Sequence, residues 1–197
     1  MRIKMTATFF LLLCLALVVP GLATPEVKKD HKNGGKESFS ALAELPVAGR
    51  TMNVRIYIDR YSSPQDAQAL HAILIDGGPK GLLKALQKMK PIGKIEQDAA
   101  VSFYDFKFIL SKSTATGRHI YALTDRPIGF LEAYYDTRSK DYPFGVMELD
   151  LQSDEKGKEK GVGTLIYAAQ IKVLDGERVE IENFTFAPIK LLGVRKL

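Results

Sequence analysis

The chain has 197 residues, one cysteine and a formal net charge of +5 at pH 7. This length suits a single domain after any leader. Because Cys14 lies in the apolar N-terminal run, the rest of the chain cannot form disulfides, thiol catalytic sites or zinc–cysteine and iron–sulfur centres. The modest positive charge is weak support for an anionic partner. No basic motif interleaved with aromatic residues predicts nucleic-acid binding.

The first 23 residues have the pattern of a secretory leader. Arg2 and Lys4 give a positive start, residues 9–19 are apolar but too short to span a bilayer, and a small residue, Ala23, precedes the cleavage point. The pattern predicts a signal peptide at 1–23, a periplasmic or extracellular location, and no transmembrane span in the mature chain. Residues 24–37 predict a disordered tether, and residues 38–197 a single domain.

The next segments predict strands around a pair of helices. Residues 39–45 favour a first strand, and residues 51–59 alternate between apolar and polar side chains, as in a strand with one face on a core. Ser63 is a good N-cap for a helix that ends at Gly77 and Gly78. Pro79 begins a second helix, so the sequence predicts a helical hairpin inserted between strands.

From residue 92 onward the pattern is β. Residues 100–110 are apolar on both alternating sets, which is typical of a central strand. Asp175 and Gly176 predict a tight hairpin, and residues 189–194 a short edge strand. The predicted fold is α+β: a curved antiparallel sheet or partial barrel of about six to eight strands with the inserted helical hairpin.

Residues 126–144 form the densest cluster of aromatic and ionisable side chains. Tyrosines there could stack on a ligand while arginines bind a carboxylate or phosphate. Alternatively, the arginines and the aspartates, Asp125 among them, brace a long crossover against itself. The predicted ligand-binding residues are Arg126, Tyr134, Tyr135, Asp136, Arg138, Asp141 and Tyr142.

Acid–base chemistry is a further hypothesis for this region. A hydrolase would need at least two of Glu132, Asp136 and Asp141 to converge in a cleft. Downstream, Glu148 and Asp150 share one face of a predicted strand, which is typical of a half-solvated strand. The histidines form no closely spaced pair, so the sequence predicts no metal site, no cofactor and no catalytic residue; His71 and His119 could meet only through the fold.

Lys80, Lys84 and Lys88 predict a basic surface on the second helix. They recur every four residues opposite its leucines, and no acid lies between Pro79 and Lys90. Such a row is either a solvated helix face or a surface for an anionic envelope or acidic partner.

Three segments carry a family resemblance: LLKALQKMKPIGKI, ALTDRPIGFLEAYYDTRSKDYPFGVMELDL and VEIENFTFAPIKLLGV. They resemble a family of uncharacterised exported proteins of environmental bacteria. The resemblance covers residues 51–194 and implies an exported single-domain protein with no assigned activity.

Together these features predict an exported non-catalytic binding or envelope-associated domain for a small molecule or an anionic envelope surface. One alternative is a barrel-like carrier of a small apolar ligand, with Tyr104, Phe106 and Phe108 lining its cavity. The other is a hydrolase that uses the carboxylates of residues 126–144.

Overall fold

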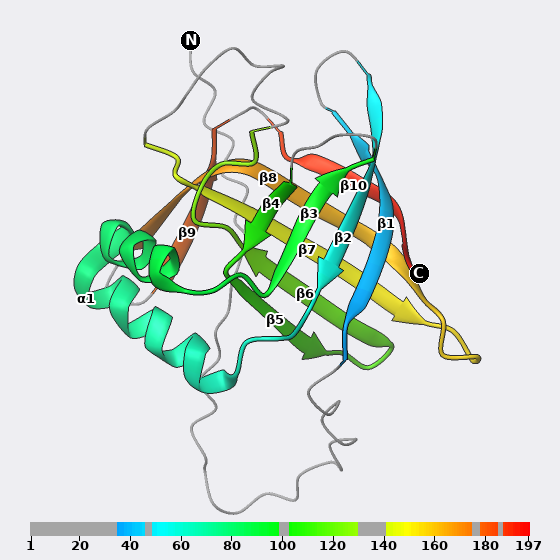
Figure 1. The fold of residues 1–197 in the computed structure, drawn as a ribbon, viewed down its shortest axis with the longest axis horizontal. Coiled ribbons are helices and arrows are strands. Elements are labelled where there is room, and N and C mark those ends of the chain that lie inside the picture. Colours follow the sequence, from blue (N-terminus) through cyan, green and yellow to red (C-terminus); the bar gives the residue numbers. More distant parts are fainter. Residues whose placement is uncertain (1–34, 46–48, 99–102, 130–140, 175–177, 185–186) are drawn as a thin grey trace, which may run out of the picture.

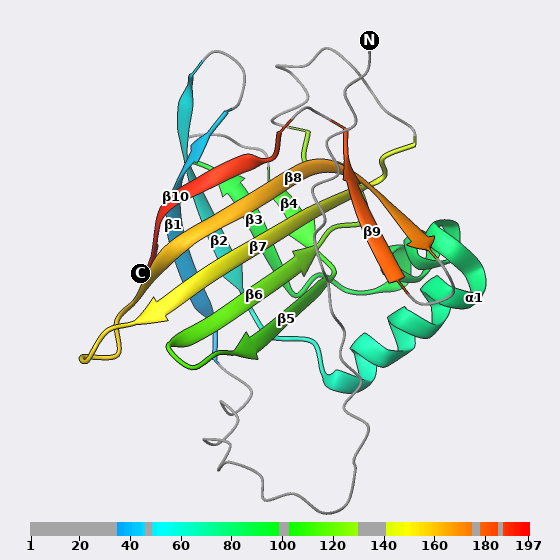
Figure 2. The same cartoon turned by 180° about the vertical axis from the view of Figure 1, so that it is seen from behind.

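The computed structural model describes residues 35–197 except 46–48, 99–102, 130–140, 175–177 and 185–186. These residues form a strongly curved antiparallel sheet, nearly closed into a barrel, with one helix packed outside it (Figures 1 and 2). The predicted antiparallel α+β fold is confirmed. The described part contains ten strands, more than the six to eight predicted.

The strands are β1 (Glu37–Glu44), β2 (Thr51–Ile58), β3 (Gly93–Gln97), β4 (Phe103–Phe106), β5 (Phe108–Ser113), β6 (Gly117–Leu123), β7 (Phe144–Ser153), β8 (Glu159–Leu174), β9 (Arg178–Asn183) and β10 (Ile189–Lys196). Helix α1 (Pro64–Lys88) lies between β2 and β3. The strand order is β4-β3-β2-β1-β10-β8-β7-β6-β5, with β9 paired to β8. β1 begins at Glu37, the last residue of the predicted tether.

Alternate side chains of the strands point into the barrel and fill it with apolar groups, as the sequence pattern of β2 predicts. Met52, Val54, Ile56 and Ile58 are buried, whereas Thr51, Asn53 and Arg55 are exposed. Side chains from all around the sheet join them in one core; the fully buried ones include Phe39, Ile95, Phe106, Ile109, Ile120, Met147, Leu149, Leu165 and Leu191.

The prediction of one central strand over residues 100–110 is wrong. The chain bends at Lys107 and places β4 and β5 at the two opposite ends of the strand order. Phe106 lies in the barrel core, whereas Phe108 packs with the cluster beneath α1, so the predicted aromatic face is split between two places. Alternation alone cannot reveal this bend, because both halves keep a strand pattern.

The predicted edge strand at residues 189–194 is also wrong. β10 lies inside the sheet, with β1 on one side and β8 on the other. This strand joins the N-terminal strands, β1 to β4, to the later strands. Its partners are distant in the sequence, which is why local pattern could not place it.

The linker after β2 hydrogen-bonds to the edge strand β5. The Ser62 N–H donates to the Ile109 carbonyl at 2.7 Å, and the Ile109 N–H donates to Ser62 Oγ at 3.1 Å. A Cβ added to Gly93 of β3, the neighbour of edge strand β4, would stand 2.7 Å from Ile109 Cδ1. β3 and β5 thus come close although they are not neighbours in the strand order.

Helix α1 covers the outer face of the sheet around β8. The Ser63 side chain caps it by accepting from the Asp66 N–H, and the Asp66 carboxylate accepts from the Ser63 N–H. Gly78 has φ 62° and interrupts the helical geometry, so α1 consists of two helices that meet at a kink, and the predicted break between them is confirmed. The buried leucines of the helix pack on Phe144, Ile166 and Ile171. No helix in the described residues combines the length and apolar character needed to cross a membrane.

Replacing Gly161 on β8 with alanine should destabilise the barrel by about 3 kcal/mol, because the added Cβ would stand 1.8 Å from the Asp150 carbonyl oxygen. Gly77→Ala is the matched control: its Cβ meets nothing within 4 Å, and alanine favours helix. Urea denaturation of both variants checks this. Equal stability of the two variants would contradict the close packing at Gly161.

Candidate functional site

The predicted binding segment is only partly described. Tyr134, Tyr135, Asp136 and Arg138, together with Glu132, lie outside the described residues. Their role in binding or hydrolysis therefore stays a prediction.

The described ends of that segment are attached to neighbouring strands. The Arg126 guanidinium lies 5.3 Å from the centre of the Tyr104 ring on β4. The Tyr142 hydroxyl donates to Glu182 on β9 at 2.7 Å, and the Tyr142 ring meets Phe184 edge-on. Asp141 is exposed. These contacts tie the described ends of the crossover to the body of the protein.

Asp125 takes a partner outside the segment. Its carboxylate lies 3.8 Å from Lys107 Nζ, at the bend between β4 and β5. Lys107 Nζ also donates to the Met89 carbonyl at the end of α1. Asp125 therefore links the start of the crossover to that bend, and not to the described part of the segment itself.

A buried ion cluster at one end of the barrel is the first feature that sequence reasoning missed. Arg118 of β6 donates to both carboxylate oxygens of Glu159 at 2.6 Å, to Glu37 at 3.1 Å and to the Tyr61 hydroxyl at 3.0 Å. Lys196 donates to Glu37 at 2.7 Å. Arg118 is 6% exposed. Its position on the apolar alternation of β6 is the signal that could have revealed it.

The charges in this cluster compensate one another. Burial opposes ionisation of Glu37, but hydrogen bonds from Lys196 and Tyr61 and the Arg118 charge outweigh it and hold its pKa below 4.5. Burial and the hydrogen bond to Glu37 raise the pKa of Tyr61. Two cations thus face two carboxylates beside a neutral phenol. This balance is typical of a structural cluster.

A second polar cluster lies on the outer face of β6 and β7. His119 Nδ1 is 3.7 Å from Glu148, and the His119 ring stacks on Tyr121. Burial raises the pKa of the Glu148 carboxyl, against the opposing effects of His119 and the Tyr121 hydrogen bond. The predicted sharing of one face by Glu148 and Asp150 is confirmed. His71 lies on α1, and no group of three His, Cys, Asp or Glu in the described residues could hold a metal ion.

On the outer face of the sheet, an open groove of about 430 Å³ lies across β2, β1 and β10. Its polar lining includes Ser40, Asn53, Arg55, Asp98 and Arg195, and its apolar lining includes Leu42, Leu192 and Leu197. Sequence reasoning missed all of these residues, because they come from distant parts of the chain.

A β-bulge in β10 creates the hollow. Leu42 pairs with Leu192 and Ser40 with Arg195, so Gly193 and Val194 both stand opposite Ala41. Gly193 has φ +57°, and a Cβ added to it would meet nothing within 4 Å. Glycine adopts this conformation without strain and leaves the position empty. Glycine inside a strand pattern is the signal that could have indicated the bulge.

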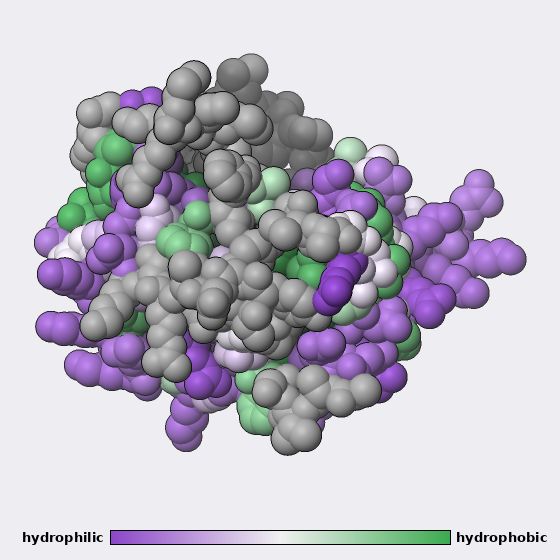
Figure 3. Space-filling model, turned by 90° about the horizontal axis from the view of Figure 1, so that it is seen from above, coloured by the Kyte–Doolittle hydropathy of each residue, from purple (hydrophilic) through white to green (hydrophobic). Residues whose placement is uncertain are grey.

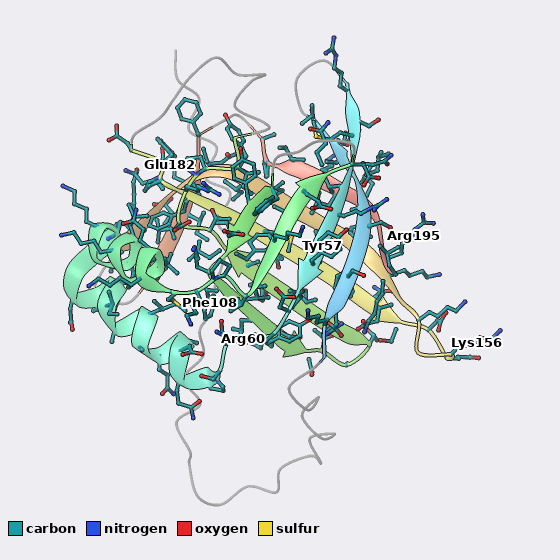
Figure 4. All side chains as sticks on the ribbon, viewed as in Figure 1. Tyr57, Arg60, Phe108, Lys156, Glu182 and Arg195 are labelled. Carbon is teal, nitrogen blue, oxygen red and sulfur yellow. The ribbon has the colours of Figure 1, made fainter. Side chains whose placement is uncertain are left out.

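Basic side chains lie in a row beside the groove. The register places four outward residues next to one another on β8, β10, β1 and β2: Lys160, Arg195, Ser40 and Arg55. Arg55 Nε is 2.8 Å from Asp98, and Arg195 Nε donates to Ser40 Oγ at 3.0 Å. Figure 4 shows Arg195 and Glu182 on opposite sides of the barrel, so the groove is separate from the Tyr142 contact.

Comparison with protein-family models, curated proteins and solved structures finds no match to this chain. The resemblance to exported proteins of environmental bacteria therefore stays a prediction. The function has to be argued from the geometry of the groove and of the clusters.

Replacing Arg118 with methionine should destabilise the protein by about 3–5 kcal/mol, because it leaves two poorly solvated carboxylates with Lys196 as the remaining cation of the cluster. Arg55→Met removes an arginine from a more exposed pair with Asp98 and should destabilise the protein far less, because solvent screens that pair. Denaturant unfolding of both variants tests this. Similar losses would show that burial does not distinguish the two pairs.

Glu37 should also make stability depend on pH. Because its pKa is lowered on folding, its stabilising contribution is complete above the unfolded-state value of about 4.5 and is lost as the pH falls through the folded-state pKa. The difference in free energy of unfolding between wild type and Glu37→Gln should be largest near neutral pH and shrink below pH 4.5. Denaturation at a series of pH values measures it, and a constant difference would count against the cluster.

Proposed function

We propose that this chain is an exported, non-catalytic binding domain and that its groove takes an anionic amphiphile, an apolar segment carrying one carboxylate or phosphate. The observation that carries the proposal is the position of Arg195 beside two exposed leucines in a preformed hollow. A volume of about 430 Å³ lies within the range of small-molecule sites.

The apolar part of the ligand would lie on Leu42 and Leu192. These side chains stand opposite each other on β1 and β10 and are 37% and 36% exposed. Val162 on β8, beside the bulge, is 53% exposed and extends the apolar row. Covering these side chains with an apolar chain would remove them from water, which favours binding.

The anionic group would bind Arg195. Its Nε donates to Ser40, and no acidic side chain among the described residues lies within ion-pair distance of it. A guanidinium with free donors suits a carboxylate or phosphate, since it can bind two oxygens at once. Lys160, the adjacent residue on β8, adds positive charge.

The lining favours binding over catalysis. Asp98, the acidic residue of the lining, is paired with Arg55 at 2.8 Å, so its carboxylate is already engaged by a neighbouring side chain. The core side chains that fill the barrel favour a ligand on the outer face over one inside.

Gly193→Asn should weaken binding about tenfold or more, because the new side chain fills the hollow while asparagine tolerates the positive φ. Arg195→Gln should have a similar effect through the lost charge-assisted hydrogen bonds. Gly157→Asn is the matched control: Gly157 also has positive φ and open space, but it lies in the β7–β8 hairpin. Titration calorimetry with decanoate and decyl phosphate measures the affinities.

The two ligands separate carboxylate from phosphate recognition. Binding of either one, lost in the two groove variants and kept in Gly157→Asn, supports the proposal. Binding that survives both groove variants places the site elsewhere. Absence of binding by both ligands to the wild-type chain overturns the proposed function.

A further inference from the structure

We propose that the second half of α1 docks the protein on an anionic phospholipid bilayer through Lys80, Lys84 and Lys88. This surface, called the lysine ridge, is separate from the groove, since α1 lies on the far side of the barrel from β1 and β10 (Figure 1). The proposal does not depend on the groove having a ligand.

The fold presents the three lysines together. Leu82 and Leu86 are 4% and 0% exposed and pack toward the sheet, whereas the lysines on the opposite side are exposed. A rise of 1.5 Å per residue gives the ridge a length of about 12 Å. Packing of the leucines therefore holds the lysines outward.

The charge of the ridge is not compensated within the described residues. None of its lysines lies within 4.0 Å of a carboxylate, whereas Lys94, Lys107, Lys172 and Lys196, among others, have such partners. The nearest acid before the ridge along the helix, Asp76, precedes the Gly78 kink. Figure 3 shows hydrophilic side chains projecting from the side of the molecule where α1 lies.

The chemistry of the ridge favours a bilayer over a folded protein partner. The exposed side chains Lys80, Lys84, Gln87, Lys88 and Lys90 offer flexible ammonium groups with no exposed large apolar residue among them. A specific protein interface usually has a buried apolar centre. A surface of many mobile phosphates needs only uncompensated positive charge, and each lysine near it strengthens binding several-fold.

The test uses the full chain with vesicles of phosphatidylcholine alone and of phosphatidylcholine mixed with phosphatidylglycerol. Sedimentation measures binding to both kinds of vesicle, and the quantity compared is the ratio of binding with and without the anionic lipid. Any binding of residues 1–34 to neutral vesicles therefore cancels. Lys80→Gln/Lys84→Gln/Lys88→Gln should reduce this gain about a hundredfold at low salt. The matched control, Lys112→Gln/Lys156→Gln/Lys158→Gln, removes the same charge from exposed positions on β5 and the β7–β8 hairpin.

A large loss in the ridge variant with little loss in the control supports docking through the ridge. Equal losses would show that only net charge matters, and the proposal would fail. It would fail as well if phosphatidylglycerol did not increase vesicle binding of the wild-type chain. That result would also be obtained if the ridge bound an acidic protein and not a bilayer. Circular dichroism melting confirms that both variants fold, which the exposure of all six lysines leads us to expect.

Discussion

Arg118 connects, through charge, parts of the chain that lie far apart in the sequence. Its carboxylate partners are Glu37 at the start of β1 and Glu159 at the start of β8, and Lys196 joins them from the end of β10. Each of these side chains occupies an inward-facing position of its strand, at the end of the barrel. An apolar side chain at this end would be in contact with water, and the protein has a charge-balanced layer of side chains there instead. Because burying any one of these ions alone would be costly, the four elements must come together in one arrangement.

A different constraint applies at the two edge strands, where the barrel does not close by strand pairing. Edge strands with free hydrogen-bonding groups invite association with other chains. Here the bend at Lys107 sends β4 and β5 to the two edges, and Ser62 from the linker after β2 bonds to Ile109 of β5. The same linker carries Tyr61 to the Arg118 cluster. One short segment thus covers an edge and completes the ion layer.

The features that could be predicted from the sequence are those set by nearby residues. The alternation of β2, the Ser63 cap and the break at Gly78 follow from local preferences and were predicted. The partners of β10 and the separation of β4 from β5 depend on contacts across most of the chain, and they were missed. Composition drew attention to residues 126–144 because reactive side chains are adjacent there in sequence. The groove residues become neighbours only through the register of β2, β1 and β10.

Gly193 links the groove to the ion cluster. Leu191 faces the core, so strict alternation would turn Arg195 inward and Val194 and Lys196 outward. The extra residue at Gly193 reverses this order: Val194 becomes buried, Lys196 reaches Glu37, and Arg195 turns to the outer face. A single glycine in β10 therefore supplies a cation to the interior cluster and another to the groove. Because one bulge sets both positions, the shape of the groove is tied to the stability of the barrel end, which favours a preformed site over one that assembles on binding.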